Sequence, residues 1–332
     1  MKSLSIALLA VVTLSAVFSI VVEEQPNASP VVVTYIDKIN GWWPPATIAA
    51  GIGVPGYAKD TSYNVFNIAF WLSSGPTDIA DIWADPLHYF SAQNPFGSTS
   101  AEIQANLTSM YHAAGKKIMI SAFGATEFPT SGGKDAVKTC TDLANFVKTN
   151  QLDGVDLDYE DNAAMNSGAG VQWLIDCTTA IRKVLPVGQY ILSHAPQAPY
   201  FMGEPKYPKG GYLEVDKQVG HLIDYYNVQF YNQDQSSYDT LESLFINSNG
   251  WATNSSIQQM INNGIPGSRI VIGKPVTTGD ASNTGWVAAS ALQGIIKQGK
   301  QQVPQWTSPG VMTWQYSSDK EGSFIDAVAQ AL

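Results

Sequence analysis

Three carboxyl groups recur at every second position near the middle of the chain, at Asp156, Asp158 and Glu160. Successive side chains of a β-strand point to opposite faces, so these three would share one face and the apolar residues between them the other. Like charges a few ångströms apart in a poorly solvated site repel and raise one another's pKa, so the stability of the fold does not explain the arrangement. The spacing therefore predicts a site in which carboxyl groups exchange protons.

The position of each carboxyl group along the predicted strand indicates its role. Glu160 lies at the carboxyl end, where barrel enzymes place their chemistry, and a pKa raised by the cluster would make it a general acid. Asp158 and Asp156 lie progressively deeper and would share a proton. Two alternatives stay open, an exposed acidic strand edge and a Mg²⁺ or Ca²⁺ site. The metal site is disfavoured because three in-line carboxylates diverge along a strand.

Short β-branched or aromatic runs alternate with longer helical patterns, which is typical of parallel strands joined by crossover helices. Eight such runs are present, the number that a closed (β/α)8 TIM barrel needs. The predicted strands are 31–36, 65–70, 117–122, 154–159, 190–194, 225–231, 270–274 and 310–314. The predicted helices include 100–114, 134–149, 171–185, 255–263 and 287–298, with Asn254 placed to cap the fourth.

The segment around these three carboxyl groups resembles a motif of a known family. The pattern Asp153-x-x-Asp156-x-Asp158-x-Glu160 is similar to the DxxDxDxE motif of family 18 glycoside hydrolases, the chitinases and endo-β-N-acetylglucosaminidases. The resemblance extends over nearly the whole chain after the first residues, and Ala125 departs from it by replacing a glycine. Further matching segments are 121–124 after the third strand, 195–197 after the fifth, 229–232 at the sixth and Trp314 at the eighth.

The resemblance implies a retaining mechanism assisted by the substrate, an exception to the scheme with two protein carboxylates. Glu160 would protonate the glycosidic oxygen while the sugar's own 2-acetamido carbonyl attacks the anomeric carbon. Asp158 would orient that acetamido group, and Tyr231 would hydrogen-bond its oxygen. Trp314 would form the floor under the sugar ring, and Gln229 would line the wall.

Other residues are assigned with less detail. We expect Asp156 among the catalytic residues, and Asn232, Ser121, Gln197 and Tyr35 among those that bind substrate. His194 is interpreted as a hydrogen-bonded core residue. Trp42, Trp43 and Trp71 follow the first two strands and could either stack on sugars or lie in the core. No metal and no cofactor is implied, because the chemistry needs only a carboxyl group and the substrate's amide.

Three functions remain open from the sequence. The first is a chitinase that cleaves β-1,4 N-acetylglucosamine linkages; the second is an endo-β-N-acetylglucosaminidase that cuts the chitobiose core of N-glycans. The third is a catalytically silent lectin or inhibitor on the same barrel, which the intact acid and its aspartate disfavour. Residues 274–310 are too few for a large α+β insertion, so we expect an open groove and internal cleavage.

Composition and the first residues restrict the compartment and the partners. The net charge of −10, without a Lys/Arg cluster, argues against a nucleic-acid partner. A lysine followed by a short apolar run predicts a secretory signal over residues 1–20, cleaved between Ala16 and Val21, before a single catalytic domain over 28–332. No second apolar stretch approaches membrane length. We therefore expect a secreted monomer without a membrane partner.

Two cysteines and three sequons bear on export. Cys140 and Cys177 lie in predicted helices that flank one strand, so a disulfide and two buried thiols are both open. Asn27, Asn106 and Asn254 each begin an Asn-x-Ser/Thr triplet and are possible N-glycosylation sites.

Overall fold

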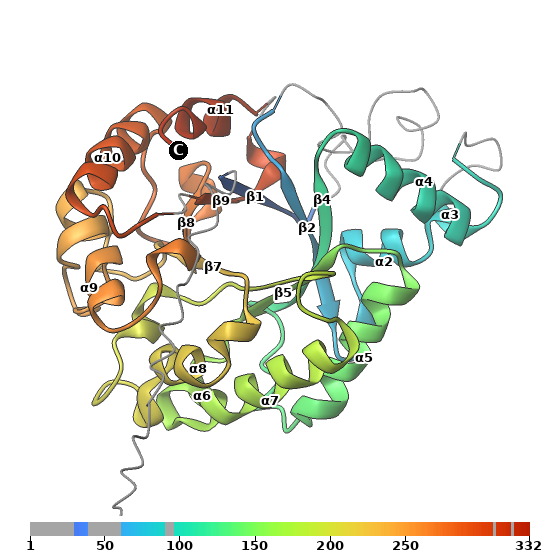
Figure 1. Ribbon diagram of the computed structural model, residues 1–332, viewed down its shortest axis with the longest axis horizontal. Helices are drawn as coiled ribbons and strands as arrows, with labels where there is room; N and C mark the ends of the chain where they lie inside the picture. Colours follow the sequence, from blue (N-terminus) through green and yellow to red (C-terminus); the bar gives the residue numbers. More distant parts are fainter. Residues whose placement is uncertain (1–29, 39–60, 90–95, 308–309, 320–321) are drawn as a thin grey trace, which may run out of the picture.

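A computed structural model describes residues 30–38, 61–89, 96–307, 310–319 and 322–332 of the chain. Eight parallel strands form a closed barrel, which confirms the predicted (β/α)8 fold, and helices surround it (Figure 1). The barrel closes because β1 pairs with both β2 and β9. The strands are β1 Val31–Ile36, β2 Val65–Leu72, β4 Lys117–Gly124, β5 Gly154–Tyr159, β6 Ile191–His194, β7 Tyr225–Gln229, β8 Ile270–Pro275 and β9 Gly310–Trp314, with a short antiparallel β3 Gly75–Pro76 beside β2.

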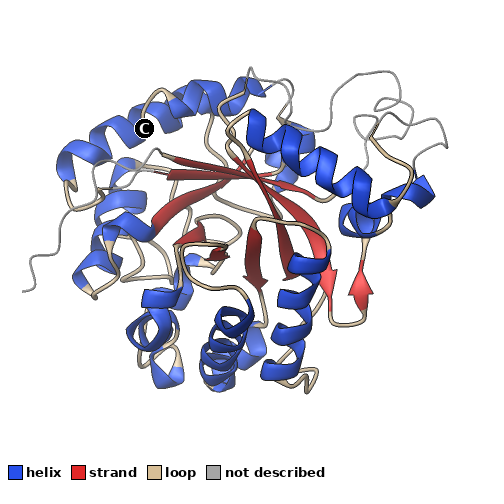
Figure 2. Ribbon diagram, turned by 45° about the vertical axis from the view of Figure 1, so that its right-hand side comes forward, coloured by secondary structure: helices blue, strands red, loops and turns tan. Residues whose placement is uncertain are grey.

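The helices cover the outside of the barrel, as the ring of helices around the strands in Figure 2 shows. Larger elements alternate with short 3-10 turns in the connections after β6, β7 and β8. The principal helices are α2 Asp78–Ala84, α3 Pro86–Tyr89, α4 Ser100–Ala113, α5 Ala136–Thr149, α6 Asn162–Ser167, α7 Ala169–Val184, α8 Tyr212–Val219, α9 Ile257–Asn262, α10 Ala289–Gln302 and α11 Ser323–Ala329.

Alternation along the strands divides the buried side chains into two layers. Ile270 and Ile272 of β8 belong to the large apolar layer between strands and helices, whereas Val271 belongs to a smaller cluster inside the barrel. On β5, Asp156 and Asp158 take the inward positions and are 0% and 5% exposed. The barrel interior at this level is therefore polar, while the fold is stabilised mainly by the outer apolar layer.

Element ends differ from the sequence-based prediction in two places that matter. The sixth barrel strand, β7, ends at Gln229 and not at Tyr231, so Tyr231 lies in the loop that follows. Ser256, not Asn254, caps α9, because its side chain accepts from Gln259 N while Gln259 reciprocates. Asn254 instead adopts a positive φ of 61° just before the cap.

A disulfide joins two neighbouring outer helices. Cys140 of α5 and Cys177 of α7 are bonded, with their Cα atoms 5.2 Å apart and a sequence separation of 37. Both side chains are fully buried between the helices and the strands. The bond therefore links the helix before β5 to the helix after it.

The connection from β8 to β9 is short. Its described residues contain one 3-10 turn, Thr278–Asp280, and α10, and hold no α+β subdomain. No helix in the described part of the chain is long and apolar enough to cross a membrane. The predicted signal over residues 1–20 and the sequon at Asn27 lie outside the described residues.

Candidate active site

Asp156 is held by four hydrogen-bond donors from four other strands. Its Oδ2 accepts from the hydroxyls of Tyr35 (2.7 Å) and Ser121 (2.9 Å). Its Oδ1 accepts from the hydroxyl of Ser193 (2.6 Å) and from Asn227 Nδ2 (3.0 Å). Burial raises the pKa of Asp156, and the four donors act in the opposite direction. Both oxygens of this carboxyl group are therefore occupied as acceptors.

Asp158 and Glu160 both contact the side-chain amide of Gln229. Gln229 Nε2 donates to Asp158 Oδ1 at 2.9 Å and lies 3.4 Å from Glu160 Oε1. Its nitrogen also donates to the Ala195 carbonyl at 2.9 Å, which fixes the amide orientation. Gln197 Nε2 approaches Glu160 Oε2 at 3.3 Å from the loop after β6. Glu160 lies directly after β5 and is partly exposed, whereas Asp156 and Asp158 are buried.

The electrostatics of the pair favour a retained proton. Burial raises the pKa of Asp158 well above its ordinary value, and the nearby Glu160 and Asp156 carboxylates raise it further. Burial also raises the pKa of Glu160, against hydrogen bonds from Gln229 and Gln197 that lower it. A hydrogen bond between Asp158 and Glu160 acts on both pKa values. Protonation of Asp158 and protonation of Glu160 are therefore coupled, and the sharing of a proton between Asp158 and Asp156 stays a prediction, because the Asp156 carboxylate also raises the pKa of Asp158.

Tyr231 lies over the carboxyl groups from the loop after β7. It is 5% exposed, and burial followed by the charges of Asp158, Glu160 and Asp156 raises the pKa of its phenol well above the ordinary value. Gly285 of the next loop approaches so closely that a Cβ there would lie 2.4 Å from Tyr231 Cα. The phenol therefore stays protonated and can donate a hydrogen bond.

An aromatic group faces the carboxyl groups from the other side of the barrel. Trp314, at the end of β9, is partly exposed, and its ring centroid lies 6.1 Å from that of Phe70 in a stacked arrangement. The Tyr35 ring lies against it with centroids 5.7 Å apart. An apolar surface of this kind suits the flat C–H face of a sugar ring.

Several residues predicted to bind substrate have other contacts here. Tyr35 and Ser121 are 1% and 0% exposed, and both hydroxyls are engaged by Asp156, so they support the site from below. The Asn232 side chain accepts from Ser282 N at 2.7 Å and thereby fastens the loop after β8. Gln197 alone of these four reaches Glu160.

Trp71 and His194 both lie in the core. Trp71 is 6% exposed and packs against Phe123, so it is a core residue and not a sugar platform. Trp42 and Trp43 lie outside the described residues. His194 is fully buried between Thr178 and Tyr212, and burial lowers its pKa to about 3, consistent with the core interpretation.

Ser193, Asn227 and Phe70 are site residues that the sequence analysis missed. Ser193 and Asn227 are polar residues at inward positions of otherwise apolar strands, a signal that could have identified them. Phe70 carried no such signal, because an aromatic residue at a strand end is usual in a core.

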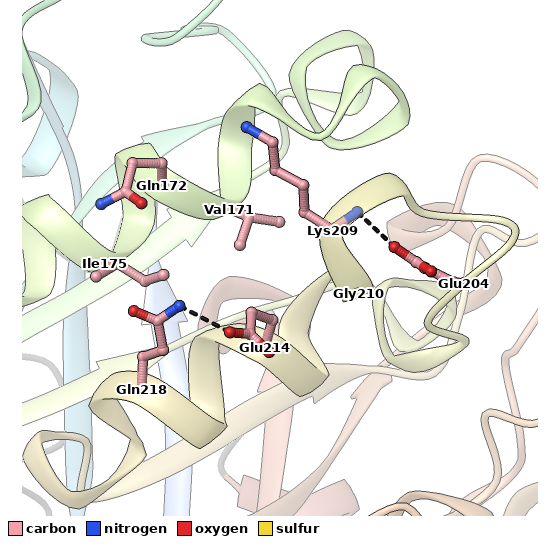
Figure 3. A pocket seen from close by; sticks show the side chains of 8 residues that line it. All are labelled: Val171, Gln172, Ile175, Glu204, Lys209, Gly210, Glu214 and Gln218. Carbon is pink, nitrogen blue, oxygen red and sulfur yellow. Dashed lines mark hydrogen bonds between the residues drawn. The ribbon is translucent and has the colours of Figure 1, made fainter.

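A separate hollow lies on the outer wall of the barrel. It measures about 450 Å³ between α7 and α8, and Val171, Glu204 and Glu214 are among the side chains that surround it (Figure 3). Its carboxylates accept from Lys209 N and Gln218 Nε2. None of the barrel's inner carboxyl groups lines it. Among the residues that the structure describes, no group of three or more His, Cys, Asp or Glu side chains is arranged to hold a metal ion.

Comparison with known proteins matches this geometry to a family. The model of the glycosyl hydrolases family 18 matches residues 52–326, which is most of the chain. The chain belongs to glycosyl hydrolase family 18. A solved family 18 chitinase from Pseudoalteromonas aurantia is 32% identical, with a TM-score of 0.65 over 91% of this chain and 100% of that one.

Two curated relatives are more distant. An acidic endochitinase of Cicer arietinum is 26% identical over 284 residues, which cover 80% of this chain and 83% of that protein. Chitinase 1 of Candida albicans is 27% identical over 239 residues, covering 66% of this chain and 43% of that protein. The chain therefore spans less than half the length of the Candida relative.

Proposed function

We propose that this family 18 protein is a secreted chitinase that hydrolyses β-1,4 N-acetylglucosamine linkages with retention of configuration. The observation that carries the proposal is the contact of the Gln229 amide with both Asp158 (2.9 Å) and Glu160 (3.4 Å), two carboxyl groups whose pKa values are raised by burial. Glu160 is partly exposed at the carboxyl end of β5, so its carboxyl group can reach substrate and act as acid. The relatives of similar length, named as chitinases, support the same substrate class.

In the first step, the Glu160 O–H protonates the glycosidic oxygen and the bond from that oxygen to the anomeric carbon breaks. The carbonyl oxygen of the sugar's 2-acetamido group attacks the anomeric carbon, which gives a cyclic oxazolinium ion. Asp158 accepts a hydrogen bond from the acetamido N–H, and its negative charge stabilises the cation. The proton that Asp158 and Glu160 share must therefore rest on Glu160 when substrate is bound.

Water completes the reaction from the side that the leaving group vacated. The Glu160 carboxylate takes a proton from water as the oxygen attacks the anomeric carbon, and the ring opens to restore the acetamido group. Tyr231 donates its phenolic O–H to the acetamido oxygen, and its raised pKa keeps that proton in place. Trp314 supports the apolar face of the distorted sugar ring.

Export and processing belong to the same proposal. A signal over residues 1–20 would direct the chain to an oxidising compartment, where the bond between Cys140 and Cys177 can form. Asn254 is exposed, and so is Asn106, although its Nδ2 donates to the Phe96 carbonyl. We propose that the catalytic domain over 28–332 acts as a monomer outside the cell.

The substrate class is tested by incubating the purified protein with N-acetylglucosamine hexamer and, separately, with a high-mannose glycoprotein. Short oligomers with the β-anomer formed first would support a retaining chitinase. Release of glycans without cleavage of the hexamer would replace chitin by N-glycan cores as the substrate. Binding of the hexamer without any cleavage would leave a lectin and overturn the enzymatic proposal.

A further inference from the structure

Lys274 breaks the pattern of its strand. The preceding residues of the same face of β8, Ile270 and Ile272, are apolar and belong to the outer layer of the core. Lys274 follows them at the next position on that face and is 0% exposed. A buried ammonium group is costly unless hydrogen bonds replace its water, so a lysine here needs a local explanation.

The ammonium group has a complete set of acceptors, all of them main-chain carbonyls. Lys274 Nζ donates to Tyr238 O at 2.7 Å, to Phe230 O at 2.9 Å and to Gly285 O at 3.0 Å. In the described part of the chain it forms no ion pair with a carboxylate. An ammonium has three N–H donors, so each carbonyl receives one.

These carbonyls belong to the two loops that surround Tyr231. Phe230 immediately precedes Tyr231, beyond the end of β7, where no regular strand pairing fixes its carbonyl. Gly285 packs against Tyr231 from the loop after β8, and the adjacent Thr284 carbonyl accepts from Asn232 N at 2.9 Å. Tyr238 closes the other end of the loop after β7. Three loop segments therefore meet at one nitrogen behind Tyr231.

We infer that Lys274 is a positioning residue, whose ammonium fastens the two loops that hold the Tyr231 phenol over Asp158 and Glu160. The inference rests on the proposed function only for the part that Tyr231 plays in hydrolysis. Lys274 itself does not touch substrate, since it is fully buried on the outer face of β8. Burial lowers the pKa of Lys274 to about 7, with Asp239 acting in the opposite direction. The three carbonyls favour the charged form.

The first test is a double-mutant cycle on hexamer hydrolysis. Lys274→Met keeps the length of the side chain without its donors and should lower kcat on the order of 10- to 100-fold through misplacement of Tyr231. In the Tyr231→Phe background the same substitution should have little further effect on kcat, because the group that it misplaces is absent. Lys217→Met, at an exposed lysine on α8, is the matched control and should not change kcat. Independent, multiplying effects of the two substitutions would overturn the inference.

Chemical rescue distinguishes the effect of the Lys274 N–H donors from the effect of the side chain's volume. The chain has two cysteines and they are bonded to each other, so Lys274→Cys introduces the one free thiol. Alkylation of the unfolded, disulfide-intact variant with bromoethylamine, then refolding, restores an ammonium of similar length; propyl iodide gives the same shape without donors. Recovery of kcat by the aminoethyl adduct alone is the expected result. Equal recovery by both adducts would show that Lys274 only fills space.

A spectroscopic readout does not depend on the reaction. In protein labelled with 3-fluorotyrosine, the ¹⁹F resonance of Tyr231, assigned with Tyr231→Phe, should shift and broaden in Lys274→Met. An unchanged resonance would overturn the inference even if the wild-type protein hydrolysed nothing. Failure of the wild type to cleave the hexamer, with a changed resonance, would reject the proposed function and keep the role of Lys274.

Discussion

Asp156 and Asp158 are the same residue type two positions apart, but their carboxyl groups have different hydrogen-bond partners. Asp156 receives four donors and no proton is needed to satisfy it. Asp158 receives one amide hydrogen bond and lies between two other carboxyl groups. Environments that separate the properties of neighbouring acids are the usual way to divide catalytic roles. The deeper aspartate is therefore held in place by its four donors, and the upper one is coupled to Glu160.

Glu160→Gln tests the acid directly. The amide keeps the shape and the contact with Gln229 but has no acidic proton, so we expect kcat on N-acetylglucosamine hexamer to fall about 100-fold or more. Affinity for the hexamer, measured by calorimetry, should remain within a few fold of the wild type. Glu214→Gln, on the outer hollow, is the matched control and should behave as the wild type. Near wild-type turnover of Glu160→Gln would contradict the assignment.

The raised pKa of the pair also makes stability depend on pH. Asp158 and Glu160 hold a proton more tightly in the fold than in the unfolded chain. Their contribution to the free energy of unfolding is therefore fully present below about pH 4, near the unfolded pKa values, and is lost as pH rises through the folded pKa values. The Tm of the wild type should fall more between about pH 5 and pH 8 than that of Asp158→Asn/Glu160→Gln. Parallel Tm curves would mean that the pair is not coupled to folding.

Sequence alternation predicted which carboxyl groups come together, but not what surrounds them. The spacing of Asp156, Asp158 and Glu160 is local, so a strand period of two suffices. The donors to Asp156 come from residues 35 to 121 positions away, through strand register and barrel closure. Those long-range pairings decide which donors each carboxyl group receives. No periodicity in one sequence encodes them.

At the scale of elements, eight strand positions were predictable because buried parallel strands are continuous apolar runs. The end of β7 was not, because Phe230 and Tyr231 continue the apolar run after regular pairing has stopped. The residue that takes over the Phe230 carbonyl is Lys274, 44 positions further along the chain. Strand ends are decided by such partners, whereas strand centres are decided by composition.

The link between α5 and α7 gives a prediction about stability. Replacing both cysteines by serine removes a cross-link over 37 residues, which in the loop-entropy account should lower the free energy of unfolding by roughly 3 to 4 kcal/mol. Denaturant unfolding of the double variant under oxidising conditions measures the loss. Hexamer hydrolysis should be unchanged at 25 °C, because both cysteines lie in the outer layer. A loss of kcat without a loss of stability would contradict this separation.

At the scale of the whole molecule, the short connection from β8 to β9 leaves that side of the barrel without an additional wall in its described residues. A barrel face without such a wall would admit the middle of a polymer. We therefore expect internal cleavage, seen as a rapid fall in viscosity of soluble carboxymethyl chitin for few new reducing ends. Release of disaccharide with viscosity nearly constant would instead indicate attack from chain ends.

The four donors to Asp156 lie on both sides of it in the sequence. Tyr35 of β1 and Ser121 of β4 precede it, and Ser193 of β6 and Asn227 of β7 follow it. A protein divided between α7 and β6 would leave the carboxylate with half of its donors and Glu160 without Gln229. We therefore expect neither fragment to hydrolyse substrate alone, and turnover to return only where the two assemble. The turnover rate of a mixture of such fragments would then be proportional to the amount of closed barrel and would measure assembly of the fold.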